Sequence, residues 1–217
     1  MLIRLAIRNV FRNTRRSLLT AGMVTLGSAL LCLSMAWMEG VFGEVLKLYT
    51  ATSGHVRIVD PEYAKLEKMM PLYANVSDAQ KLTETIGAMD NVRSAFPRTS
   101  VGVTITNTDE IGDHFALLMG APIDLYETEY DLKNQLMEGG GWFETPDDIL
   151  LGRKVATKLG AKVGDEITMN GMTQDGTLSA VRGRLVGIVS GENPVQERQA
   201  FMSLERVQYL TDMADAS

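Results

Sequence analysis

The chain has 217 residues, of which 45% are hydrophobic and 22% are charged, and its formal net charge is −6. This composition is typical of a folded protein and excludes a disordered tail. The single cysteine excludes an internal disulfide and a cysteine-based zinc site, and the two histidines leave little for other metal chemistry.

The charge is unevenly distributed along the chain. Residues 1–16 contain five arginines and no acidic residue, whereas residues 17–217 carry 16 basic and 27 acidic side chains. The helical spacing of the arginines, beside an apolar face, predicts a basic amphipathic helix at the cytoplasmic membrane interface, in contact with anionic lipids. The simpler alternative is that these arginines only set the topology. The five are Arg4, Arg8, Arg12, Arg15 and Arg16.

Residues 17–38 form a run of 22 residues without a formal charge. As a helix this run is about 33 Å long, enough to cross a hydrocarbon core of about 30 Å. The arginines before the run, with Glu39 and Glu44 after it, predict a cytoplasmic N-terminus and an exported remainder. A cleaved signal peptide is the nearest alternative, but its apolar region is normally only about 7–15 residues long.

The predicted membrane helix carries a stripe of small residues at helical spacing. Such a stripe is typical of membrane helices that pack closely on partners, although chance composition also produces one. The apolar positions keep the helical period after the membrane, so we expect the helix to continue to about Thr52. The stripe consists of Ala21, Thr25, Ser28, Ala29, Cys32 and Ala36.

Residues 53–217 mix strand and helix patterns without strict alternation, which predicts an α+β domain. We expect helices after a capping box formed by Ser77 and Gln80, and after an N-cap at Ser203. Further helices are expected at 132–138 and at 153–159, the latter ended by Gly160. Strands are expected at 55–60, 92–96, 101–105, 115–119, 149–151 and 167–170, and one long strand or two short ones at 178–189. The predicted organisation is therefore 1–16 (interfacial helix), 17–52 (membrane helix with its extension) and 53–217 (exported domain).

Signals for catalysis are poor. The glycines at 139–141 lack the Lys-Ser/Thr of a phosphate-binding loop, and no nucleophile elbow is present. His55 and His114 each have acidic neighbours, but ordinary strand and loop polarity explains these equally well. An acidic exported domain also argues against binding of nucleic acid. We therefore expect no catalytic residue, no metal site and no nucleic-acid partner.

Four segments, in order along nearly the whole chain, resemble a known family of membrane proteins. The start LAIRNVFRNTRRSLLTAGMVTLGSALL (5–31) resembles the arginine-rich elbow and first span of ABC-transporter permeases of the lipoprotein-releasing (Lol), macrolide-exporter (MacB) and FtsX-like class. SGHVRIVDPEY (53–63) is similar to the first strand of their periplasmic domain. ILLGRKVATKLGAKVGDEITM (149–169) and RLVGIVSGENPVQERQAFMSLERVQYL (184–210) are similar to two recurrent runs of the same domain.

The resemblance implies a MacB-like periplasmic core and a location in the inner membrane. It also implies a second permease subunit, identical or homologous, and a separate cytoplasmic subunit that holds ATP and Mg, so that this chain has no cofactor of its own. A lipoprotein or other amphiphile is then moved outward, with a periplasmic carrier or adaptor as a further partner. Family members continue with three more spans, so the domain is expected to be incomplete at Ser217.

A substrate-binding surface is predicted from the same resemblance. Flexible apolar side chains accommodate acyl chains, and packing on other membrane helices is the equal alternative. A different function is a membrane-anchored binding or adaptor domain without transport, and a third is a secreted protein after signal cleavage. The proposed surface consists of Met35, Met38, Phe42 and Leu46.

Overall fold

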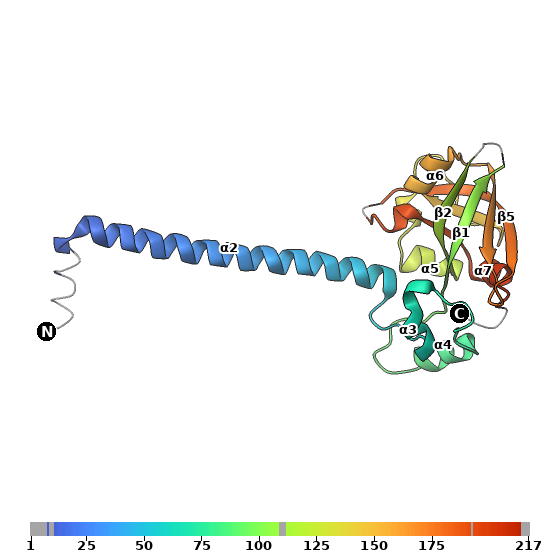
Figure 1. The fold of residues 1–217 in the computed structure, drawn as a ribbon, viewed down its shortest axis with the longest axis horizontal. Coiled ribbons are helices and arrows are strands. Elements are labelled where there is room, and N and C mark those ends of the chain that lie inside the picture. Colours follow the sequence, from blue (N-terminus) through green and yellow to red (C-terminus); the bar gives the residue numbers. More distant parts are fainter. Residues whose placement is uncertain (1–7, 9–10, 109–111, 192, 214–217) are drawn as a thin grey trace. The chain divides into compact units, whose positions relative to one another are not determined.

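The computed structural model describes residues 8, 11–108, 112–191 and 193–213. The chain divides into two compact units, Met1–His55 and Val56–Ser217, and each is described here by itself. The first unit is dominated by one long helix and the second contains a barrel of strands (Figure 1).

Helix α2 (Thr14–Ser53) runs without a break through 40 residues. Hydroxyl groups inside it bond to backbone carbonyls one turn earlier, for example Thr20 Oγ1 to the Arg16 oxygen at 2.9 Å. These bonds satisfy the polar groups within the helix, so an apolar environment costs them little. The helix ends where Gly54 adopts a φ of 74°, a conformation that glycine takes without strain. The end lies within a residue or two of the expected one.

The second unit is built on a closed barrel in the order β1-β2-β6-β3-β5-β4. Strand β1 also pairs with β4, which closes the ring. The pairs β2/β6 and β3/β5 are parallel and the others are antiparallel. The fold is α+β, as predicted. The strands are β1 (Thr99–Asn107), β2 (Asp113–Ala121), β3 (Asp148–Gly152), β4 (Glu166–Met172), β5 (Leu178–Val189) and β6 (Gln199–Ser203).

Short helices connect the strands and cover the barrel. Helix α6 contacts β2 and β3, and α7 contacts β2, β4 and β5. Figure 1 shows α3 and α4 beside the barrel, before the first strand. The helices are α3 (Pro61–Leu66), α4 (Ala79–Gly87), α5 (Ile123–Thr128), α6 (Arg153–Leu159) and α7 (Leu204–Thr211), with 3-10 turns η1 (Glu67–Met69), η2 (Lys133–Gln135) and η3 (Gln196–Arg198).

The core forms two apolar clusters. In the larger one, alternate residues of β1, Val101, Val103 and Ile105, point inward, as their period of two predicts. The second cluster surrounds Tyr126, whose ring contacts the rings of Phe143 and Phe201. All of β3 is buried, because Ile149 and Leu151 belong to the larger cluster and Leu150, on the opposite face, belongs to the second.

Several elements were predicted correctly. Helix α6 ends at Gly160 in the left-handed conformation, and the Ser203 hydroxyl accepts a hydrogen bond from the Arg206 amide at the start of α7. The expected strands at 101–105, 115–119, 149–151, 167–170 and 178–189 are all present. The connection after β4 is a short turn in which the Thr173 amide bonds to the Thr177 oxygen.

The two earliest predicted strands were wrong. Residues 55–60 and 92–96 form no strand, although Val56 and Ile58 alternate with polar residues. A closed barrel offers no free edge with which an additional strand can pair. Pro97 has no amide hydrogen, which also weakens pairing directly before β1.

Two helix predictions and one strand need correction. Residues 132–138 form only the 3-10 turn η2, because Leu136 instead pairs with Val189 of β5. Helix α4 is present, but its N-cap is Asp78 in the left-handed conformation, which places Ser77 outside the cap. Strand β6, between η3 and α7, was not predicted, because it depends on pairing with β2 and β3, which are distant in the sequence.

Candidate functional site

Helix α2 exposes apolar side chains on every side. The segment Thr14–Lys47 is long and apolar enough to cross a membrane. Its large apolar side chains are between 46% and 75% exposed in the chain by itself. A helix that is apolar on every side is suited to a lipid environment.

The arginines before the span stand at its N-terminal end. Arg8, Arg12, Arg15 and Arg16 are exposed, while Arg4 lies outside the described residues. Most of the predicted interfacial helix at 1–16 also lies outside them, so it stays a prediction. Arg15 and Arg16 belong to the first turn of α2, whereas Arg12 lies before its N-cap residue, Asn13.

The predicted small-residue stripe lies along one side of α2. All its members are exposed, and Cys32 is a free thiol. Thr25 Oγ1 bonds to the Ala21 oxygen at 2.8 Å, and Ser28 Oγ bonds to the Thr25 oxygen at 3.0 Å. The stripe therefore presents small side chains whose hydroxyls are already satisfied, which permits close approach of another helix.

The predicted substrate surface lies further along the same helix. Met35, Met38, Phe42 and Leu46 are 57% to 73% exposed. At about 100° per residue these four side chains cluster on one side, about a quarter of a turn from the small-residue stripe. The structure thus brings each predicted set onto one face of α2, and which partner covers either face stays a prediction.

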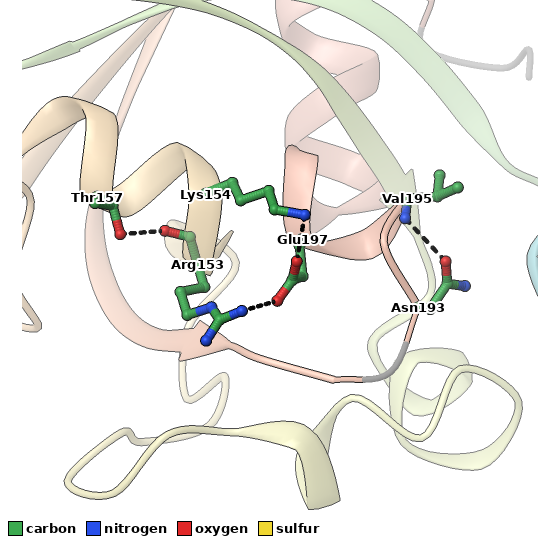
Figure 2. A network of polar contacts seen from close by, with 6 residues as sticks. All are labelled: Arg153, Lys154, Thr157, Asn193, Val195 and Glu197. Atoms are coloured by element: carbon green, nitrogen blue, oxygen red, sulfur yellow. Dashed lines mark hydrogen bonds and ion pairs between the residues drawn. The ribbon is translucent and has the colours of Figure 1, made fainter.

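In the barrel domain, the most buried charge is a carboxylate held by two cations. Glu197 is 6% exposed, and its two oxygens each lie 2.7 Å from a cation, Arg153 Nη2 and Lys154 Nζ (Figure 2). The hydrogen bond from Lys154 lowers the pKa of Glu197 below its usual 4.5, and the nearby charges of both cations act in the same direction against desolvation. The carboxylate is therefore ionised at neutral pH.

Local backbone packing explains why Glu197 reaches α6. A Cβ atom on Gly152 would lie 2.3 Å from the Gln196 oxygen, so only glycine lets the turn η3 lie against the start of α6. The Asn193 side chain accepts a hydrogen bond from the Val195 amide and shapes the same turn (Figure 2). Sequence reasoning did not single out Glu197, because its partners are more than 40 positions away and no short motif links them.

The described residues contain no group of three His, Cys, Asp or Glu side chains arranged to hold a metal ion. His114 is half-buried on β2, and burial together with the charge of Lys158 lowers its pKa below 6.5. Two of the acidic residues near it in sequence, Asp109 and Glu110, lie outside the described residues.

The described chain thus combines a helix long and apolar enough to cross a membrane with an α+β domain built on a closed barrel that has its own core. The sequence model of the MacB-like periplasmic core domain family matches residues 17–216. The chain therefore belongs to this family, and with it to the class of ABC-transporter permeases that includes MacB and the FtsX-like proteins.

Solved structures of two proteins are similar to the chain. The extracellular domain of the noncanonic ABC-type transporter YknZ from Gram-positive bacteria is 13% identical, with a TM-score of 0.47, over 66% of this chain and 70% of that one. The periplasmic region of MacB from Actinobacillus actinomycetemcomitans is 13% identical, with a TM-score of 0.45, over 66% of this chain and 63% of that one. The comparison with curated proteins gave no match.

Proposed function

We propose that the chain is a permease subunit that couples ATP hydrolysis, carried out by a separate cytoplasmic subunit, to the outward movement of a lipoprotein or another amphiphile. Family membership supports the permease class. The observation that carries the proposed coupling is the unbroken helix α2, which joins the arginine-rich end to the residues beyond the span.

The length of α2 suits a transmitting element. Its 40 residues correspond to about 60 Å, of which about 33 Å lie in the uncharged run and about 22 Å follow Met38. Hydrogen bonds along a continuous helix oppose bending, so a displacement at Arg15 moves the distal turns as well. The end at Gly54 then marks where the rigid element stops.

The substrate is proposed to contact Met35, Met38, Phe42 and Leu46. These side chains are exposed, apolar and without polar groups, and methionine adapts its shape to the group that it contacts. An acyl chain needs such a surface, because it offers no group for a directional hydrogen bond. The lipoprotein is thus proposed to lie against the distal half of α2 at the outer surface of the membrane.

The proposed assembly lies in the inner membrane with the N-terminus of this chain in the cytoplasm. It contains a second permease subunit, identical or homologous, packed on the small-residue stripe, and a cytoplasmic subunit that holds ATP and Mg. This chain is proposed to be neither an enzyme nor a cofactor carrier. A periplasmic carrier or adaptor is a further proposed partner.

Site-specific photo-crosslinking tests this function. A photoreactive phenylalanine analogue replaces Phe42 in the complete transporter, in inner-membrane vesicles that contain an acylated, labelled lipoprotein. Glu44 is the matched control position, because it is exposed at the same level but lies about 200° around the helix. We expect adducts with the lipoprotein from position 42 that decrease on ATP addition, and few from position 44.

Three outcomes contradict the proposal in different ways. Adducts of position 42 only with other membrane helices reject the substrate surface and favour helix packing. Lipoprotein adducts that do not respond to ATP favour a binding or adaptor domain without transport. Loss of residues 1–36 from the mature protein, measured by mass spectrometry, favours a secreted protein.

A further inference from the structure

A groove on the barrel domain gathers cations that the permease function does not use. Its volume is about 610 Å³, and it lies between α6, the start of β2 and the end of η3. The residues that line it include His114, Phe115, Arg153, Lys154, Lys158 and Arg198. The groove belongs entirely to the second unit of the chain.

The charge of the groove opposes that of its domain. Residues 56–217 carry 15 basic and 25 acidic side chains, a balance of −10. Four of the 15 basic side chains line this one groove, and Glu197 neutralises at most one of them. Lys158 and Arg198 are exposed, and no ion pair involving either is found in the described parts of the chain. The groove is thus a local positive site on an acidic surface.

Glu197 also orients part of this positive site. It fixes the Arg153 guanidinium and the Lys154 ammonium by contacts of 2.7 Å, although these two side chains are still 52% and 44% exposed. Cations that are held in place before a ligand arrives lose less conformational entropy on binding. Both cations line the groove, and the exposed part of each side chain is accessible to a ligand there.

One wall of the groove is apolar. The Phe115 ring is 69% exposed and lies over Gly102 of β1, where a Cβ atom would be only 2.7 Å from the ring. The groove therefore offers several cations beside an aromatic face. A ligand that fits it carries more than one negative group, and its aliphatic parts can contact the Phe115 ring.

We propose that this groove binds an acidic segment of a partner protein. Its volume falls in the range that accommodates several ligand groups, whereas a single phosphate fills only a small part of it. An anionic bilayer is an extended negative surface and would repel the whole domain, which has a net charge of −10. A single acidic peptide is small enough to contact the groove alone. This proposal does not depend on the direction or cargo of transport.

The test uses the full chain in nanodiscs of zwitterionic phosphatidylcholine and a fluorescein-labelled dodecaglutamate peptide as the probe. Binding is measured by fluorescence anisotropy at low and at physiological ionic strength. The variant Lys158→Glu/Arg198→Glu reverses the two groove cations without an ion pair. The control Lys65→Glu/Lys81→Glu makes the same charge change at exposed positions on α3 and α4.

We expect the groove variant to weaken peptide binding by about tenfold or more, because like charges then face each other, and the control to weaken it by less than about threefold. Circular dichroism verifies that both variants are folded. Equal weakening in both variants, or no peptide binding by the parent chain, overturns the proposal.

Two further arms separate other anions from an acidic peptide. Displacement of the peptide by inorganic phosphate at an equal concentration of negative groups shows a simple anion site and overturns the proposal. If the peptide does not bind, but the parent chain binds phosphatidylglycerol vesicles and the groove variant does not, the groove is a lipid site. This outcome also overturns the proposal. Failure of phosphate and of vesicles to compete supports it.

Discussion

Helix α2 and the barrel use apolar residues in opposite ways. Every large apolar side chain of the span is at least 46% exposed, whereas Ile149, Leu150 and Leu151 of β3 are completely buried. The helix satisfies its backbone by bonds between residues four apart, so it needs no tertiary partner to form. The barrel satisfies its backbone only when strands distant in sequence meet.

This difference predicts where a mutation affects folding. A change on the surface of α2 alters contacts with lipid or with a partner but leaves the barrel core intact. A change inside the barrel removes contacts that hold several strands at once. The variants below either compare α2 with the barrel or test single contacts within the barrel. They are given from the largest expected effect to the smallest.

Leu151→Ala should lower the free energy of unfolding of the barrel by about 3–5 kcal/mol, because it leaves a cavity in a core that cannot collapse fully. The matched change Leu31→Ala on α2 should alter it by less than about 0.5 kcal/mol. Urea unfolding followed by circular dichroism measures both. A similar loss in the two variants would show that the helix and the barrel unfold as one unit.

Gly152→Ala should cost about 3 kcal/mol, because the added methyl group meets backbone atoms of Gln196 and Glu197 that cannot rotate away. Gly87→Ala, at the end of α4, has open space around the new methyl group and should be neutral or slightly stabilising. The same urea titration compares them. Stability unchanged in Gly152→Ala would mean that η3 does not lie against α6.

Tyr126→Phe should cost about 2 kcal/mol, since the hydroxyl is buried and lies 2.7 Å from the Met119 oxygen and 2.9 Å from the Met202 oxygen. The loss leaves carbonyl groups of two strands without this partner. Tyr209→Phe, at a mostly exposed ring on α7, is the control and should change stability little. Thermal unfolding at neutral pH distinguishes the two.

Glu197→Gln should remove a small acid-dependent part of the stability. The native pKa of Glu197 is lowered, so the unfolded state binds the proton more readily. The stabilisation is complete above pH 4.5 and is lost as the pH falls through the lower native pKa. Urea midpoints across this range should fall less steeply in the variant than in the parent chain or in the exposed control Glu205→Gln. Identical slopes would contradict this role for Glu197.

The sequence predicted best those elements that depend on neighbouring residues. The charge-free run from Ser17 to Met38, the glycine that ends α6 and the serine that caps α7 are all local signals, and each has its expected structure. The alternation in β1 also identified its buried face. The positions of the candidate residues along α2 followed directly from helical spacing.

The sequence did not reveal which extended segments would pair. Residues 55–60 have as good a strand pattern as β6, yet only β6 is paired, because it fits between β2 and β3 in a ring that is then closed. Similarly, Leu136 joins β5 and not a helix. Competition for backbone partners is decided by the whole barrel, and no window of a few residues contains that information.

The net charge of −6 is the sum over a basic N-terminal segment, an uncharged apolar run and an acidic remainder. Sequence alone therefore identified the candidate membrane helix and the family resemblance, because both depend on local composition and order. Only the tertiary structure showed the Glu197 contacts and the basic groove beside them. Their side chains come from elements far apart in the chain, and only closure of the barrel brings those elements together.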